Sequence, residues 1–315
     1  MMELQQVDKL EILIVIDNYA DSMLENAPGV QRRVIESNGF LPTDTVLAEH
    51  GVCFLLTAWK DGKKVGLIFD AGFSPIAAPR NLEFMNVSLD HVEAMAISHA
   101  HEDHIGATKQ LLTMAGNPPL CAHPICFHHP RYWRADDGSM LQYPEMINRD
   151  DLQASGHTII EKSEPSVVGD GCFLLTGQIP RHTDFEHGLP GSVMEVDGEL
   201  VPDDILDDQA IVVDVKGHGI VVVSGCGHAG IVNTIRYARE LTNGRSLYAL
   251  MGGFHLPGSQ FRHAVKPTLD AIKAENPKMV VPMHCTGTEA KAIMRFELGD
   301  TFVDSAVGTR IQLPF

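Results

Sequence analysis

Basic and aromatic side chains are scarce in this chain. Its 315 residues include only 5 tyrosines and 2 tryptophans, and 24 lysines and arginines stand against 41 aspartates and glutamates, for a net charge of −17. Because nucleic-acid binding depends on clustered Lys and Arg that neutralise phosphates, this balance argues against a nucleic-acid partner. A local basic pocket for one phosphorylated small molecule is still compatible with it.

Long apolar segments are also lacking. The longest runs, such as Leu10–Ile16 and Ile220–Val223, are far shorter than a bilayer span. The first ten residues carry Glu3 and Asp8, where a signal peptide would have a basic start and an apolar stretch. The six cysteines show no repeating spacing, which argues against a disulfide framework. We therefore expect a cytoplasmic protein with reduced thiols and no membrane partner.

The sequence is rich in histidine and in short apolar runs. It has 16 histidines, and 44% of its residues are hydrophobic, which is enough for a sizeable core. Runs that are typical of buried strands are Leu10–Ile16, Val52–Ala58, Gly66–Phe69, Val92–Ile97, Cys172–Thr176, Ala210–Val215, Ile220–Ser224, Leu247–Met251 and Lys278–Met283. Helical periodicity predicts helices over Ile105–Ala115, Ile231–Leu241 and Phe261–Ala274, and the sequence KGHG at 216–219 indicates a hairpin turn. This mixture favours an α/β (α+β) sandwich with helices outside paired sheets.

The sequence offers no clear boundary between domains. No linker rich in Gly or Ser divides it, so we expect residues 1–315 to form a single domain. Residues 117–165 are poorer in strand pattern and rich in His, Pro, Tyr and Trp. This segment is either a lid or insertion over the functional site or a surface excursion without function. Arg131 within it either contacts an anionic substrate or belongs to a solvated stretch.

The most informative segment is SHAHEDH at residues 98–104, directly after the strand predicted at 92–97. It combines three imidazoles with a carboxylate, from His99, His101, His104 and Asp103. These side chains cannot all be core residues, because each would need its own hydrogen-bond partner when buried. Neutral imidazole and carboxylate oxygen are good ligands for zinc, iron or manganese. The segment therefore predicts a metal site.

The pattern His99-x-His101-x-Asp103-His104 after an apolar strand resembles the defining loop of the metallo-β-lactamase superfamily. Asp70, in LIFDAG at 67–72, matches that superfamily's strand-Asp-x-Gly element. The resemblance implies a four-layer αββα sandwich that carries one or two divalent metal ions at the open edge of its paired sheets. It also implies that Asp70 steadies the ligand loops from behind.

Four further motifs resemble one branch of that superfamily. They are LAEHG at 47–51, SGCGHAG at 224–230, GGFHL at 252–256 and PMHCTG at 282–287. The branch is that of the 7,8-dihydropterin-6-methyl-4-(β-D-ribofuranosyl)aminobenzene-5′-phosphate synthases, which are similar to dihydropteroate synthases. The resemblance implies condensation of a dihydropterin pyrophosphate with an aminobenzene ribofuranosyl phosphate, and hence a small, phosphorylated substrate.

An argument that does not depend on the family supports a single site. Four of the predicted strands lead directly into loops that carry His99, His228, His255 and His284. Ligands on loops at strand ends, held by a rigid sheet, are a common way to build a metal site. Histidines scattered at random would not follow strands so regularly.

The resemblance implies which side chains bind metal. His99 and His101 are expected to hold one ion, and Asp103, His104 and His284 the other. Zinc is the expected metal, and the same ligands also accept iron or manganese.

One departure from the family concerns the third motif. Cys226 stands where the family usually has a bridging Asp, so we expect one ion to bind tightly and the second weakly. His228 is the favoured remaining ligand, and His182 is the formal alternative. Cys226, His182 and Asp70 are thus candidates either for the metal or for support of its ligands.

Several roles are open between alternatives. Asp103 and His255 are the expected catalytic residues, although His255 could equally be a ligand or a packing residue. Glu49 and His50 are expected to contact the substrate. The sequence permits a homo-oligomer and does not determine the oligomeric state.

Three functions are compatible with such a site. The resemblance favours the condensing enzyme, in which the metal neutralises charge on departing pyrophosphate. The first alternative is a metal-dependent hydrolase or phosphodiesterase that attacks with metal-bound hydroxide. The second is a non-catalytic metal, redox or ligand sensor, because a thiolate ligand such as Cys226 can be oxidised.

Overall fold

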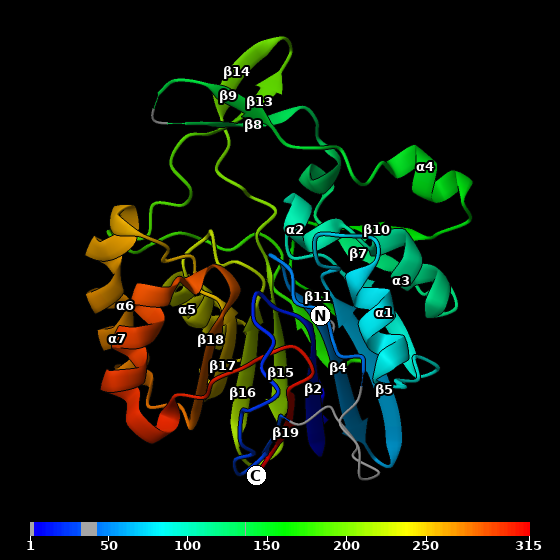
Figure 1. The fold of residues 1–315 in the computed structure, drawn as a ribbon, viewed down its shortest axis with the longest axis vertical. Helices are drawn as coiled ribbons and strands as arrows, with labels where there is room; N and C mark the ends of the chain where they lie inside the picture. The colour runs from blue at the N-terminus through cyan, green and yellow to red at the C-terminus, as the bar shows by residue number, and fades with distance from the viewer. Residues whose placement is uncertain (1–2, 33–42, 136) are drawn as a thin grey trace.

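The computed structural model describes residues 3–32, 43–135 and 137–315. Two β-sheets pack face to face, and helices cover the outer face of each (Figure 1). The structure therefore confirms the four-layer αββα sandwich. Among these described residues, no helix combines the length and the hydropathy needed to cross a bilayer.

The first main sheet has eight strands in the order β10-β7-β6-β5-β4-β2-β19-β3. In chain order they are β2 (Lys9–Ile16), β3 (Val30–Gln31), β4 (Cys53–Lys60), β5 (Lys63–Phe69), β6 (Val92–Ala96), β7 (Leu120–Ala122), β10 (Ile159–Glu161) and β19 (Arg310–Leu313). β4 and β5 form an antiparallel hairpin, whereas β5, β6 and β7 are parallel neighbours.

The second main sheet follows the order β11-β12-β15-β16-β17-β18, and β1 also pairs with β15. The strands are β1 (Gln6–Val7), β11 (Ser166–Val168), β12 (Phe173–Leu175), β15 (Ala210–Val215), β16 (Gly219–Ser224), β17 (Leu247–Gly253) and β18 (Met279–Met283). β15 and β16 form the antiparallel hairpin predicted from the turn at 216–219. β16, β17 and β18 are parallel.

A third, four-stranded sheet extends beyond the two main sheets, at the top of Figure 1. It contains β8 (Arg131–Arg134), β9 (Met140–Gln142), β13 (Ser192–Val196) and β14 (Glu199–Pro202). Residues 117–165 supply β8 and β9 to it, and they also supply β7 and β10 to the first main sheet and α4 (Arg149–Ala154). Only the middle of that segment therefore leaves the sandwich.

Apolar side chains bind the layers together. Between the sheets, Phe54 and Phe69 are completely buried and stacked, with ring centroids 6.3 Å apart. Leu82 and Leu111 attach helices to the first sheet, and Leu269 attaches a helix to the second. Full burial of a large apolar side chain contributes about 1.5–3 kcal/mol. The helices are α1 (Ala77–Phe84), α2 (Glu102–Ile105), α3 (Thr108–Met114), α5 (Ile231–Leu241), α6 (Arg262–Glu275) and α7 (Thr288–Leu298).

All nine predicted strands are confirmed within a few residues, as are the helices at 231–241 and 261–274. The helix predicted over Ile105–Ala115 is confirmed as α3, which begins later, at Thr108, because a break separates it from α2, which ends at Ile105. At the break, Gly106 donates its N–H to the carbonyl of Gly72, and a Cβ on Gly106 would lie 1.9 Å from the carbonyl oxygen of Phe73. The close approach of the loop after β5 therefore interrupts the helical path.

Candidate metal centre

Parallel pairing brings loops that are distant in sequence to one edge of the sandwich. In the second sheet, Ser224 at the end of β16 pairs with Gly252, and Gly253 at the end of β17 pairs with Met283 of β18. In the first sheet, Phe69 of β5 pairs with Ala96 of β6. Since the carboxyl ends of parallel strands share an edge, the loops that follow lie together. These loops carry all the histidines that the sequence predicts to converge.

Three of these histidines form a compact set, which we name the three-histidine group. The ligand atoms of His99, His101 and His228 lie within 4.8 Å of one another, and His99 Nε2 is 3.0 Å from His101 Nδ1. All three side chains are buried. His101 Nε2 and both ring nitrogens of His228 have no hydrogen-bond partner among the described residues.

Burial keeps the three-histidine group neutral. It lowers the pKa of His101 to about 3, with a smaller contribution from the cationic Arg131. It also lowers the pKa values of His99 and His228 well below the ordinary value. Neutral imidazole offers the lone pair that binds a metal ion. Unpaired nitrogens are costly to bury, so a cation among them would stabilise this arrangement.

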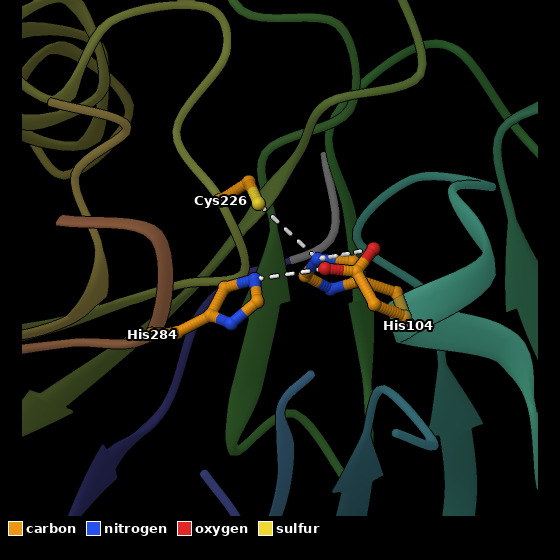
Figure 2. A group of neighbouring side chains, drawn as sticks. His104, Cys226 and His284 are labelled. Atoms are coloured by element: carbon orange, nitrogen blue, oxygen red, sulfur yellow. Dashed lines mark hydrogen bonds and ion pairs between the residues drawn. The ribbon is translucent and has the colours of Figure 1, made fainter. Parts of the chain in front are cut away.

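Asp103, His104, Cys226 and His284 form a second set beside the first, which we name the mixed group. Their ligand atoms also lie within 4.8 Å of one another. His104 Nε2 is 3.2 Å from Cys226 Sγ, and His284 Nε2 is 3.2 Å from Asp103 Oδ2. Figure 2 shows Cys226, His104 and His284 pointing toward one another, with His104 from α2, Cys226 from the loop after β16 and His284 from the turn after β18.

The mixed group is charged where the three-histidine group is neutral. Burial lowers the pKa of His104, but Asp103 and Asp70 outweigh that effect and raise it to about 9. Burial raises the pKa of Asp103, but His104 and His284 outweigh it, so the pKa is below the ordinary value. Burial raises the pKa of the Cys226 thiol well above its usual range. Binding of a cation to this group therefore requires release of protons.

Asp70 orients His104 from behind. Its Oδ2 lies 2.8 Å from His104 Nδ1 and accepts the Ser98 hydroxyl at 2.8 Å, while its Oδ1 accepts the Ser98 N–H at 2.7 Å. This carboxylate holds the proton of His104 on Nδ1 and directs Nε2 toward Cys226. Asp70 belongs to neither ligand group, so its place matches the supporting role implied by the resemblance.

Glycine allows the Cys226 loop to reach Asp70. A Cβ on Gly225 would lie 2.1 Å from Ser98 Oγ and 2.8 Å from Asp70 Oδ2. Any larger residue would push the two loops apart. The Gly directly before Cys226 is therefore required by this contact between the two sheets.

His255 lies between the two groups. Cys226, His228 and His255 form a third, overlapping set with ligand atoms within 4.8 Å. The His255 ring centroid is 4.1 Å from that of His228. His255 and His284 have φ values of +42° and +47°, a conformation that costs a non-glycine residue roughly 1–3 kcal/mol and is concentrated at functional sites. The geometry allows His255 to bind metal or to reach a substrate beside it.

The structure separates the two residues predicted to contact substrate. His50 Nε2 lies 3.3 Å from Asp103 Oδ2, and 64% of the His50 side chain is exposed, so it borders the mixed group from outside. Glu49 Oε1 instead accepts the backbone N–H groups of Phe73 and Ser74. His50 is thus placed to meet a substrate, whereas Glu49 stabilises the loop after β5.

His182 is not brought to either group. Its side chain is exposed, and its backbone N–H donates to Asn233 Oδ1 at 2.9 Å. The structure places His228, not His182, beside His99 and His101.

Sequence reasoning missed two neighbouring carboxylates that brace the three-histidine group. Asp207 Oδ2 accepts the N–H of Ala100 at 2.9 Å, and Asp208 Oδ2 accepts the N–H of Ala229 at 2.7 Å. Both carboxylates are buried. Burial also raises the pKa of Asp208 to about 7. The available signal was a pair of adjacent acidic residues, separated by one residue from the apolar strand predicted at 210–215.

Arg131 connects Asp207, and with it Asp203, to the third sheet. From β8, its guanidinium donates to Asp207 at 3.0 and 3.1 Å and to Asp203 at 2.6 Å, entirely within the protein. Both of its charged partners are internal, so Arg131 is not open to a substrate anion. Instead, it joins β8 to the backbone beside His99 and His101.

Comparison with known proteins agrees with this geometry. Residues 48–284 match the family model of the Metallo-beta-lactamase superfamily, a stretch that includes every member of both ligand groups. The chain belongs to the metallo-beta-lactamase superfamily. Proteins of this superfamily generally bind divalent metals.

Three known proteins are similar to this chain. A 7,8-dihydropterin-6-methyl-4-(beta-D-ribofuranosyl)-aminobenzene-5′-phosphate synthase of Methanocaldococcus jannaschii is 24% identical over 311 residues, covering 96% of each chain. An uncharacterized protein of the same organism is 28% identical over 266 residues, covering 83% of this chain and 92% of its own. The crystal structure of a metal-dependent hydrolase of the beta-lactamase superfamily has a TM-score of 0.71 at 22% identity, covering 97% of this chain and 99% of that one. This last likeness establishes the shared fold.

The residues present fit a divalent ion. The three-histidine group offers three buried, neutral imidazoles with nitrogens that lack partners, and the mixed group offers nitrogen, oxygen and sulfur. Imidazole, carboxylate and thiolate together suit zinc and other first-row divalent metals.

Proposed function

We propose that this protein is a metal-dependent enzyme that condenses a dihydropterin pyrophosphate with an aminobenzene ribofuranosyl phosphate. The observation that carries the proposal is the presence of two adjoining ligand groups at one edge of the sandwich, beside the partly exposed His255 and His50. The synthase from M. jannaschii, which matches nearly the whole chain, supports the choice of substrates.

The metal content follows from the two groups. We infer one divalent ion in each, with zinc as the resident metal. The three-histidine group should bind more tightly, because its imidazoles carry no proton to displace. All six cysteines are free, and we place the protein in the cytoplasm, where the Cys226 thiol stays reduced.

The proposed reaction exchanges one bond for another at the pterin methylene carbon. The bond from this carbon to the pyrophosphate oxygen breaks, and pyrophosphate leaves with the electron pair. The amine or ring carbon of the acceptor forms the new bond and loses a proton. A bound divalent ion supplies Lewis acidity that neutralises the charge on the departing pyrophosphate.

The chain provides a residue for each remaining task. We assign the acceptance of the proton to His255, and this is supported by its ring nitrogens, which have no hydrogen-bond partner among the described residues. Asp103 Oδ2 lies between His284 and His50, at 3.2 and 3.3 Å, and orients both imidazoles. His50 is exposed on the outside of this cluster and can contact the phosphorylated substrate.

The direct test is a condensation assay. Metal-loaded protein is incubated with the dihydropterin pyrophosphate and the aminobenzene ribofuranosyl phosphate, and both pyrophosphate release and product mass are measured. We expect one pyrophosphate per product formed and no product after chelation. Pyrophosphate release without the condensed product would contradict a synthase.

A metal-dependent hydrolase is the second candidate, supported by the solved structure described as such a hydrolase. A screen of chromogenic esters, lactams and bis-nitrophenyl phosphate distinguishes the two. Turnover of these compounds, with none of the pterin pyrophosphate, would favour the hydrolase. Protein that is inert on every substrate but releases metal on mild oxidation would favour a sensor that works through Cys226.

A further inference from the structure

A pocket opens beside the metal centre on the side of the second sheet. It encloses a volume of about 80 Å³ and borders His228 and His255. This volume is smaller than the roughly 300–1,000 Å³ of a typical small-molecule site, so it would hold a ring and leave the rest of a ligand at the mouth. The loop at 185–190, the loop at 227–230 and the segment at 254–264 form its walls.

The walls of the pocket are mainly apolar and aromatic. Phe185 and Pro190 come from one loop, and Phe254, Leu256 and Phe261 come from the segment after β17. Phe254 and Leu256 are buried, whereas Phe185 and Phe261 are partly exposed. Such a lining favours a flat aromatic ring.

One end of the pocket is His255. Its ring meets Phe261 edge to face, with centroids 4.9 Å apart and planes at 90°, and lies against His228 on its other side. The edge of a ring held in the aromatic part of the pocket would therefore face the imidazole of His255, which lies next to the metal ligands.

The mouth of the pocket carries two further imidazoles. His187 and His263 are exposed and stacked, with ring centroids 6.0 Å apart and planes at 17°. They come from different walls and have no role in either ligand group. His263 Nδ1 lies 3.1 Å from the carbonyl of Gln260, which leaves its Nε2 for a ligand.

An arginine and a glutamate lie near the mouth. The guanidinium of Arg181 lies behind the wall, where a Cβ on Gly188 would be 2.8 Å from Nη1, and it donates to a backbone carbonyl of Asp204. Glu186 also lines the pocket, but both of its oxygens accept hydrogen bonds from the backbone at the start of α5. These bonds disperse the negative charge of Glu186.

We propose that this pocket binds a phosphorylated aryl amine, with its ring among Phe185, Phe254 and Phe261 and its phosphate at His187 and His263. This inference rests on the proposed function and identifies the subsite for the acceptor. The amine end then faces His255, and the dihydropterin pyrophosphate occupies the metal side.

The test is a binding measurement on metal-loaded, full-length protein. The probes are 4-(β-D-ribofuranosyl)aminobenzene 5′-phosphate and its dephosphorylated form, titrated by calorimetry. For the double variant H187A/H263A, we expect affinity for the phosphorylated probe to fall by about tenfold or more and affinity for the dephosphorylated probe to stay the same. The variant Phe261→Ala should bind both probes more weakly.

Two controls accompany these variants. His218→Ala removes an exposed histidine from the turn between β15 and β16 and should change neither affinity. Metal content should be unchanged in the double-histidine variant, because neither histidine belongs to a ligand group. Equal binding of the phosphorylated probe to the double variant and the wild type would overturn the proposal, as would a failure of either probe to bind the wild type.

The outcomes separate this inference from the proposed function. The expected binding pattern without condensed product would refute the synthase and leave the subsite in place. Product formation with an unchanged KM for the phosphorylated acceptor in H187A/H263A would support the synthase and refute the subsite.

Discussion

The three-histidine group and the mixed group lie side by side, yet they differ in charge. Burial leaves His99, His101 and His228 neutral, whereas His104 in the mixed group is held as a cation beside Asp103. The first group can accept a metal ion without losing a proton, and the second cannot. Two sites built from similar residues therefore respond differently to pH and to substitution.

The largest effect is expected from His101→Ala, which leaves only two imidazoles in the three-histidine group. We expect this variant to lose the bound metal of that group and at least about 100-fold in kcat, because Lewis acidity contributes several kcal/mol. Metal analysis and pyrophosphate release measure the two effects. His182→Ala is the matched control, since that histidine is exposed and outside both groups. Unchanged metal content in the His101 variant would mean that the ligand assignment is wrong.

Cys226→Ser tests the mixed group. We expect its metal affinity to fall by more than the roughly 10–100-fold typical of residues behind the ligands, with the three-histidine group unaffected. In cobalt-substituted protein, the thiolate-to-metal charge-transfer absorption should disappear.

Cys285→Ser provides the comparison for this experiment. Cys285 Sγ donates to the carbonyl oxygen of Cys226 at 3.3 Å, so its removal should leave the absorption in place. Loss of the absorption in the Cys285 variant but not in the Cys226 variant would show that Cys285, and not Cys226, is the thiolate ligand.

The variant Asp208→Ala should weaken metal binding by the three-histidine group, because Asp208 holds the backbone next to His228. It removes the acceptor for the Ala229 N–H, next to His228, and we expect about a 10–100-fold loss of metal affinity in that group only. Asp208→Asn keeps an oxygen acceptor in the same place and should restore most of the affinity. Equal losses for the alanine and asparagine variants would show that the charge of Asp208, and not this hydrogen bond, determines the metal affinity.

The two groups should also differ in the pH dependence of their metal affinity. The pKa of His104 is about 9 and that of Cys226 is raised, so between pH 6 and 9 metal binding to the mixed group must release protons, and affinity should rise by about tenfold per pH unit for each proton released. The pKa of His101 is about 3, so the three-histidine group should show a nearly constant affinity over that range. Metal titrations at several pH values measure both slopes. Equal slopes of metal affinity against pH for the two groups would contradict the proposed difference in their charge.

Local patterns in the sequence predicted nine of the strands that the structure describes and the loops after them, but none of the strands of the third sheet. Runs of β-branched residues give buried strands wherever they occur, because both faces of these sheets are covered. The helix predicted over 105–115 begins three residues later than predicted, because of a contact between Gly106 and the loop after β5 that no local pattern reports.

The charged residues that support the metal ligands could not be predicted from local sequence patterns, for a similar reason. Asp207 and Asp208 accept the N–H groups of Ala100 and Ala229, and Arg131 reaches Asp207 from a different sheet. Each contact spans 20 or more residues of sequence. Only packing shows that these side chains are buried and hydrogen-bonded.

By itself, the sequence determined the kinds of ligand and the strands that carry them, because residue type and short-range periodicity are local properties. The tertiary structure decided that His228 and not His182 completes the three-histidine group, that Glu49 supports a loop, and that Arg131 is internal. The reason is physical: burial and the pairing of parallel strands determine which side chains meet and which of them keep a proton.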